Sequence, residues 1–124
     1  MKFIDSNIIA YAFYENKFQD SCQRAITEGG VTDTLCLIEA FNIIEYQTTK
    51  QNAAECIKGM LKSNTKIVDI DINLIFESLK KSASHPKLRF LDLVHYIVAI
   101  NQDCEAIVSY DKDFDNLSLP RVEL

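Results

Sequence analysis

The chain has 124 residues, of which 48% are hydrophobic and 25% charged, with only three glycines and two prolines. This length predicts a single domain, residues 1–124, and the composition excludes a disordered or fibrous protein. The formal net charge of −5 excludes a protein that coats nucleic acid with its whole surface, but it is compatible with an enzyme whose acidic centre has a small basic rim.

The sequence predicts a soluble, cytoplasmic protein. No apolar run approaches the ~18 residues of a membrane helix, and the first five residues do not have the pattern of a signal peptide. The four cysteines, Cys22, Cys36, Cys56 and Cys104, form no C-x-x-C pair. This spacing favours free thiols in a reducing compartment over a zinc site.

The first half of the chain alternates between strand and helix patterns. Short strands are predicted at residues 2–5 and 31–32, and helices at residues 6–14, 18–28, 35–48 and 53–61. Gly29 and Gly30 end the second of these helices, because glycine commonly follows a helix C-terminus.

The second half continues the alternation. Residues 66–70 have the β-branched content of a strand, and Ile72, Ile75, Phe76 and Leu79 have the spacing of an amphipathic helix. After the break at His85-Pro86, a buried helix is predicted at residues 91–100, a strand at 106–108, a turn or short helix at 111–116, and a strand at 121–122. Strands that alternate with helices predict an α/β fold with a parallel sheet flanked by helices.

Four acidic residues either follow a predicted strand, where an open α/β sheet binds its ligands, or lie in an apolar helix. Asp5 closes the first predicted strand, and Asp111 follows the strand that ends at Val108. Glu39 interrupts an apolar helix, and Asp92 opens the most apolar helix in the chain. These four residues are the candidate functional side chains.

Each acid also has a structural interpretation. Asp5, Asp92 and Asp111 have the residue type that caps a helix N-terminus. Glu39 is harder to explain in this way, because a carboxylate in an apolar environment is costly unless it is paired or binds a metal. The other acids at element ends, Asp33, Asp69, Asp71 and Asp115, are interpreted as turn and cap residues.

If the four candidate acids converge, they need a cation. Two carboxylates about 4 Å apart repel each other by roughly 4 kcal/mol at an effective dielectric constant of 20. Convergence therefore requires a bound cation or raised pKa values. Ligands that are all oxygens suit Mg²⁺ or Mn²⁺, and such a centre activates water for attack on a phosphodiester.

Four segments that contain these acids resemble the four acidic motifs of the PIN-domain ribonucleases. The segments are residues 3–7, 37–41, 90–95 and 108–114. Their order and spacing match over essentially the whole chain, and the most similar group is the small VapC-type toxins of toxin–antitoxin pairs. The resemblance implies a five-stranded parallel sheet flanked by helices in three layers, with Asp5, Glu39, Asp92 and Asp111 as Mg²⁺ or Mn²⁺ ligands, directly or through water.

The resemblance also assigns supporting positions. Ser109 stands where the family usually has a threonine whose hydroxyl supports the site. Asp113 or Asp115 is an alternative to Asp111, because some relatives place the last acid slightly further along the chain. The resemblance further implies a homodimer and a cognate antitoxin.

Two residues one helical turn from candidate acids have a predicted orienting role. His95 follows Asp92, and we expect it to orient a carboxylate or to fill the wall of the site rather than to bind a hard metal ion. Asn42 follows Glu39 and is interpreted either as an orienting residue or as an ordinary helix residue.

A basic segment precedes Asp92, and its candidate RNA contacts are Lys87 and Arg89, together with Lys112 beside Asp111. The alternative is a solvated helix end with favourable cations.

The predicted function is a metal-dependent endoribonuclease that hydrolyses RNA phosphodiester bonds as the toxin of a toxin–antitoxin pair. One alternative is a PIN-like module that binds RNA or protein without cutting. Another is a phosphoacceptor domain of receiver type, in which Asp69 would be the acceptor. The receiver interpretation lacks support at the first strand, because Asp5 has no acidic neighbour.

Overall fold

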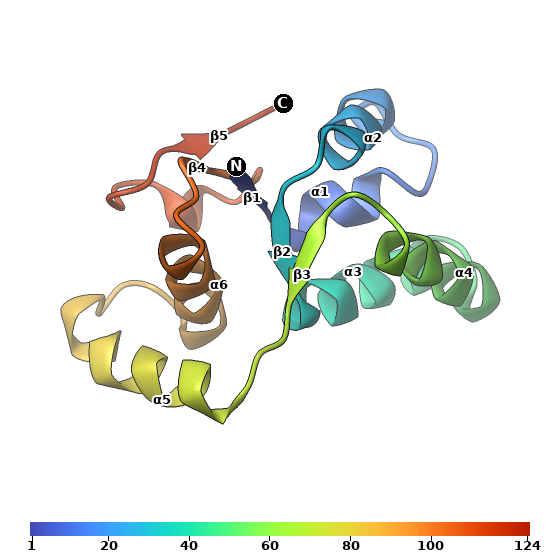
Figure 1. Ribbon diagram of the computed structural model, residues 1–124. Coiled ribbons are helices and arrows are strands. Elements are labelled where there is room, and N and C mark those ends of the chain that lie inside the picture. Colours follow the sequence, from blue (N-terminus) through green and yellow to red (C-terminus); the bar gives the residue numbers. More distant parts are fainter.

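The computed structural model describes residues 1–124 and contains a five-stranded parallel sheet (Figure 1). The strands lie in the order β3-β2-β1-β4-β5. Their bounds are β1 Lys2–Ile4, β2 Val31–Asp33, β3 Lys66–Val68, β4 Ala106–Val108 and β5 Arg121–Val122. The strands β2 and β4, on either side of β1, are buried throughout, whereas the edge strands are partly exposed. This sheet confirms the predicted α/β fold.

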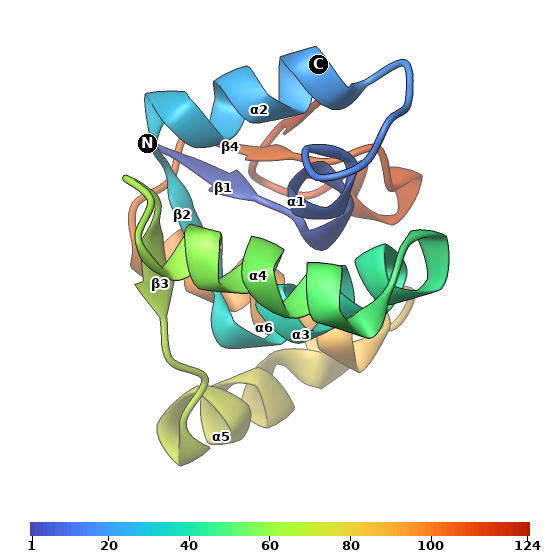
Figure 2. The same ribbon diagram turned by 90° about the vertical axis from the view of Figure 1, so that its right-hand side faces the viewer.

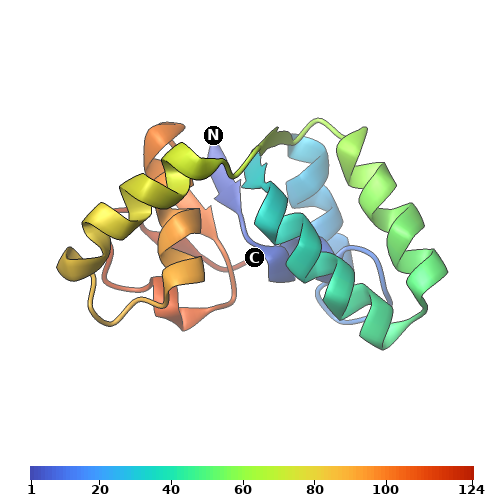
Figure 3. The same cartoon turned by 90° about the horizontal axis from the view of Figure 1, so that it is seen from below.

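Helices cover both faces of the sheet, as parallel strands require. They are α1 Ser6–Tyr11, α2 Gln19–Glu28, α3 Thr34–Gln47, α4 Lys50–Leu61, α5 Ile72–Lys81 and α6 Phe90–Asn101, with short 3-10 turns η1 Ser82–Ser84 and η2 Lys112–Phe114. Helix α4 packs against α3 (Figure 2). Helices α1 to α4 lie on one face of the sheet, and α5 and α6 on the other (Figure 3). None of the helices is long and apolar enough to cross a membrane.

Helix α6 is the most buried helix of the molecule, as its sequence predicts. All residues from Asp92 to Ala99 are buried. Leu93 and Ile97 belong to the hydrophobic core, together with Phe3 of β1 and Ile107 of β4. Burying the helix on nearly all sides also buries Asp92 and His95, the two polar residues that it carries into the interior.

Side-chain caps set several helix boundaries. Asp33 accepts a hydrogen bond from the backbone N–H of Cys36 at the start of α3 (2.9 Å), and Asp71 accepts one from Leu74 at the start of α5 (2.9 Å). Thr49 caps α4 in the same way, so this helix begins at Lys50 rather than at residue 53 as predicted. The predicted cap roles of Asp33 and Asp71 therefore hold.

The apolar stripe predicted on α5 does not face the core. The helix itself is present, but the side chains of Ile72, Phe76 and Leu79 are 86%, 62% and 55% exposed. Ser78 is the fully buried residue of this helix, and its hydroxyl group donates to the carbonyl oxygen of Leu74 (2.8 Å). This local bond satisfies the hydroxyl, so a polar residue can occupy the packed side while the apolar stripe faces outward.

Candidate active site

The register of the two central strands brings the first and last acidic segments together. Ile4 of β1 pairs with Val108 of β4, so Asp5 and Ser109 leave the sheet side by side. The backbone N–H of Asp5 donates to the carbonyl oxygen of Val108 (3.1 Å). The order of strands reverses between β1 and β4, and ligands of open α/β sheets bind at such a point.

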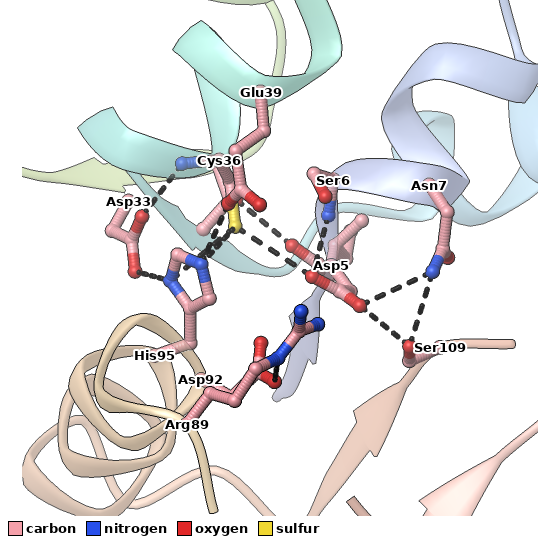
Figure 4. A network of polar contacts seen from close by, with 12 residues as sticks. Asp5, Ser6, Asn7, Asp33, Cys36, Glu39, Arg89, Asp92, His95 and Ser109 are labelled. Carbon is pink, nitrogen blue, oxygen red and sulfur yellow. Dashed lines mark hydrogen bonds and ion pairs between the residues drawn. The ribbon is translucent and has the colours of Figure 1, made fainter. Parts of the chain in front are cut away.

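A cavity of about 250 Å³ opens at this position, and all four candidate acids line it. Asp5 comes from the end of β1, Glu39 from α3, Asp92 from α6 and Asp111 from the segment after β4. Figure 4 shows how three of these acids and their partners are arranged. The remaining lining residues are Ser6, Asn7, Arg89 and Leu91.

Asp5 is 4% exposed, and its carboxylate accepts three hydrogen bonds from nitrogen and oxygen donors. One carboxylate oxygen accepts from the backbone N–H of Ser6 (2.8 Å), and the other accepts from the amide of Asn7 (3.2 Å) and from the hydroxyl of Ser109. The Ser109 oxygen in turn accepts from the backbone N–H of Asp111 (2.9 Å). Burial raises the pKa of Asp5, and the Ser109 hydrogen bond partly offsets this increase. Asp5 is thus both the cap of α1 and a wall of the cavity.

Asp92 has the opposite environment. It is 6% exposed, and its Oδ2 atom is buried without a hydrogen-bond partner. Asp92 lies in the first turn of α6, where its charge complements the helix dipole. Arg89 occupies the N-cap position, so the prediction that Asp92 caps this helix is wrong. Burial and the negative charge of Asp111 raise the pKa of Asp92 to about 6, although the guanidinium group of Arg89, 3.6 Å from Oδ2, lowers it.

These oxygens form a suitable ligand set for a hard divalent cation. Carboxylate oxygens of Asp92, Asp111 and Asp113 lie within 4.8 Å of one another. A buried carboxylate oxygen without a donor is costly, and a cation would satisfy it. The residues therefore fit Mg²⁺ or Mn²⁺, which prefer oxygen ligands.

The buried His95 connects Glu39, in the cavity wall, to Asp33 at the end of β2. His95 Nδ1 lies 2.6 Å from Asp33 Oδ2, and Nε2 lies 2.8 Å from Glu39 Oε1 (Figure 4). Burial alone would lower the pKa of His95, but its hydrogen bonds with Asp33 and Glu39 raise it above the ordinary value. His95 therefore contacts a carboxylate, in line with its predicted role, and through one ring it links two of them.

The four cysteines are free. Cys36 is the one near the site, with its Sγ atom 3.6 Å from His95 Nδ1 and 4.0 Å from Asp5 Oδ1. Burial raises the pKa of Cys36 to about 12, so its thiol stays protonated near neutral pH. A protonated thiol is a poor metal ligand, and Cys36 acts here as a packed neutral group.

The structure favours the ordinary helix interpretation of Asn42 and adds two residues to the site. Asn42 is exposed, does not line the cavity and makes no hydrogen bond with Glu39, which is held by His95 instead. Asp33 was predicted only as a cap, because its partner lies 62 residues away in the chain. Asn7 was missed as well, although its place beside Asp5 in the first acidic motif is a usable signal.

Two acids near Asp111 have different surroundings. Asp113 is near the cavity, with its Oδ2 atom 3.8 Å from Arg89 Nη2. Asp115 instead accepts from Arg121 Nε (2.7 Å), an ion pair at the start of β5. Of the two alternatives to Asp111, the geometry therefore favours Asp113.

The predicted basic rim is only partly assembled at the cavity. Arg89 lines the cavity, whereas Lys87 and Lys112 are exposed side chains outside its lining.

The receiver-type interpretation has no support in this geometry, because Asp69 is exposed and follows the edge strand β3, away from Asp5.

Comparisons with known proteins agree with this architecture. The family model described as the PIN domain matches residues 2–119. The structure of VapC20 from Mycobacterium tuberculosis, a toxin that cleaves the sarcin–ricin loop, is similar with a TM-score of 0.81 and 13% identity, covering 98% of each chain. A toxin–antitoxin complex from Klebsiella pneumoniae has a similar chain with a TM-score of 0.72 and 14% identity, covering 98% of this chain and 96% of that one.

A comparison with curated protein sequences finds no significant match. At 13% and 14% identity, the two solved structures establish the shared fold. Because the family model covers nearly the whole chain, this protein belongs to the PIN-domain family.

Proposed function

We propose that the protein is a metal-dependent endoribonuclease of the cytoplasm, acting as a single domain of residues 1–124 and as the toxin of a toxin–antitoxin pair. PIN domains are typically nucleases. The observation that carries the proposal is the convergence of four carboxylates on one cavity, where Asp92 keeps a buried oxygen without a donor.

Asp5 and Asp92 are the proposed principal ligands of Mg²⁺, with Mn²⁺ able to substitute. Glu39 and Asp111 then bind a second ion or hold the attacking water. When bound, the ion supplies a Lewis acid that lowers the pKa of water and offsets negative charge on the phosphodiester. Ser109 and Asn7 keep Asp5 in place, because their side chains donate to its carboxylate.

The proposed reaction is a hydrolysis. The oxygen of water bonds to phosphorus, the bond from phosphorus to the ribose 3′ oxygen breaks, and that oxygen receives a proton. The water loses one proton, so the products are a 5′-phosphate and a 3′-hydroxyl end. No covalent intermediate with the protein is needed, consistent with a cavity that no histidine nitrogen or cysteine sulfur lines.

The substrate and partners follow from the same proposal. Arg89, Lys87 and Lys112 are the proposed phosphate contacts. Only three cations are involved, so the logarithm of RNA affinity is expected to fall against the logarithm of salt concentration with a slope of about −2 to −3. A homodimer and a cognate antitoxin are also proposed. The similar chain in the Klebsiella pneumoniae toxin–antitoxin complex supports the antitoxin partner.

Cleavage of an end-labelled RNA of mixed sequence tests the proposal. We expect wild type to cut with Mn²⁺ but not with EDTA. Asp92→Asn is expected to fold and to lose more than about 100-fold in rate, since replacing even a group behind a ligand costs about 10–100-fold. Asp69→Asn is the matched control, because Asp69 also follows a strand but is exposed and outside the cavity.

Two outcomes would contradict the nuclease. Wild-type rates for Asp92→Asn would remove the acidic cavity from the reaction. If no folded sample cuts RNA under any condition, the result would favour a PIN-like module that binds RNA or protein without cleavage.

A further inference from the structure

Asp33 contacts His95, and His95 in turn contacts Glu39 at the cavity. The Asp33 side chain is fully buried. Its Oδ1 atom accepts from the backbone N–H of Cys36 (2.9 Å), and its Oδ2 atom lies 2.6 Å from His95 Nδ1. Both oxygens are therefore engaged, one by the backbone of α3 and one by a ring on α6. This arrangement fixes the plane of the His95 ring.

The second ring nitrogen of His95 contacts Glu39, which lines the cavity. Nε2 lies 2.8 Å from Glu39 Oε1. An ionised carboxylate only accepts hydrogen bonds, so each ring nitrogen donates to the carboxylate it faces. The Glu39 side chain is 32% exposed and lines the cavity. Its Oε2 atom has no donor from the protein, so one oxygen of Glu39 is held and the other is free.

A purely structural role does not account for this arrangement. Capping α3 requires only a short side chain with an acceptor, and serine or threonine would serve as well as Asp33. A buried ion pair adds little net stability, because removing both charges from water costs about as much as their attraction returns. The Asp33–His95 pair therefore contributes something that a simple cap does not, namely the contact of His95 with Glu39.

We propose that Asp33 and His95 are positioning residues that hold the Glu39 carboxylate so that it offers a single oxygen to the metal centre. The inference rests on the metal centre of the proposed function. Groups that hold a metal ligand from behind are worth about 10–100-fold in metal affinity or activity. Neither Asp33 nor His95 lines the cavity, so both act through Glu39.

Substitution of Asp33 by serine separates the two roles of this residue. Asp33→Ser keeps an acceptor for the α3 cap but is too short to bind His95. The matched control is Asp71→Ser, because Asp71 caps α5 with the same 2.9 Å bond and lines no part of the cavity. Mn²⁺ affinity measured by calorimetry is expected to fall about 10-fold or more for Asp33→Ser and to be unchanged for Asp71→Ser.

Combining these variants with Glu39→Ala distinguishes positioning from general damage. If Asp33 acts through Glu39, Asp33→Ser weakens Mn²⁺ binding in the wild-type background but changes it less than about 2-fold when Glu39 is already absent. His95→Gln is expected to behave in the same way. Equal losses in both backgrounds, or wild-type Mn²⁺ affinity for Asp33→Ser, would overturn the proposal.

A spectroscopic measurement on the metal-free protein tests the contacts without RNA. Two ring N–H signals of His95, both protected from exchange with water, are expected in the nuclear magnetic resonance spectrum, and the Nδ1 signal should lose its protection in Asp33→Ser. If these signals are absent from wild type, the pair is not formed and the proposal fails.

The Mn²⁺ measurements also separate the two proposals. If wild type binds no Mn²⁺, the positioning role falls together with the metal centre. If it binds Mn²⁺, the variants behave as expected and no RNA is cut, the positioning role stands and the nuclease proposal fails.

Discussion

The two sides of the cavity differ in how their negative charge is balanced. On one side, Asp33 and Glu39 both contact the ring of buried His95, at 2.6 and 2.8 Å. On the other side, Asp5, Asp92 and Asp111 make no hydrogen bond to a cationic side chain. A ring nitrogen of His95 lies within 4.8 Å of Asp5 without bonding to it, and the cation beside Asp92 is Arg89, whose side chain is 76% exposed. We call these the paired side and the unpaired side.

The difference shows which part of the site is complete in the protein alone. Hydrogen bonds fix the paired side, so its geometry does not depend on a ligand. The unpaired side retains repulsion between carboxylates and the unsatisfied Oδ2 atom of Asp92, which a divalent cation would relieve. The fold therefore holds Glu39 in place in advance, beside carboxylates whose negative charge has no hydrogen-bonded cationic partner.

The largest stability effect is expected from removing a charge on the unpaired side. Asp92→Asn should stabilise the metal-free protein by about 3 kcal/mol at pH 8, since each pH unit between the folded and unfolded pKa values is worth about 1.4 kcal/mol. The folded pKa of Asp92 is about 6, against an ordinary 3.8. The unfolding free energy of wild type should therefore fall by about 3 kcal/mol as pH rises from about 4 to above 6, whereas that of the variant should not.

Urea unfolding in EDTA at pH 4 and pH 8 measures this effect, with Asp69→Asn as the surface control. The stability difference between Asp92→Asn and wild type should be large at pH 8 and nearly absent at pH 4. Equal pH dependence of both proteins would show that Asp92 is not strained by its neighbours.

A smaller effect on the free energy of unfolding is expected from removing the hydroxyl of Ser109 on the unpaired side. The hydroxyl of Ser109 donates to Asp5, so Ser109→Ala should cost about 2 kcal/mol in unfolding free energy, the usual worth of a bond to a charged group. Ser109→Thr retains the hydroxyl and should stay close to wild type. If both variants lost the same stability in urea unfolding, the packing of the side chain rather than its hydrogen bond would be responsible.

The smallest effect is expected at Arg89. This side chain is exposed, so Arg89→Gln should change stability by less than about 1 kcal/mol. Because Arg89 competes for Asp92, the variant should bind Mn²⁺ slightly more tightly at low salt, and the gain should shrink at high salt. The surface variant Arg24→Gln is the control in these titrations. Weaker Mn²⁺ binding by Arg89→Gln would indicate that Arg89 supports the site instead.

The fold was predictable from the sequence because its signals are local. The apolar stretch of α6 and the short strand 106–108 are read directly from neighbouring residues. The outward orientation of the apolar face of α5 was not predictable, because the spacing of its apolar residues does not show whether that face contacts the core or the solvent. Side-chain periodicity defines a face of a helix but not what that face contacts.

The convergence of the candidate acids was predictable only in part. Asp5 and Asp111 follow strands, and that position alone brought them to one edge of the sheet. The paired side could not be predicted in full, because the contact of Asp33 with His95 depends on how α6 crosses the end of β2. The sequence left two interpretations of Asn42 open, because its spacing from Glu39 does not show that its side chain faces solvent.

The most direct test of the account is a melting experiment with Mn²⁺. If the unpaired side is a cation site, Mn²⁺ at about 100 times its Kd should add about 2.7 kcal/mol to wild-type stability, which raises Tm by roughly 10 °C for a domain of this size. Asp92→Asn should show little of this increase. An unchanged Tm for wild type in saturating Mn²⁺, or an equal increase for the variant, would contradict the assignment of this side as the metal centre.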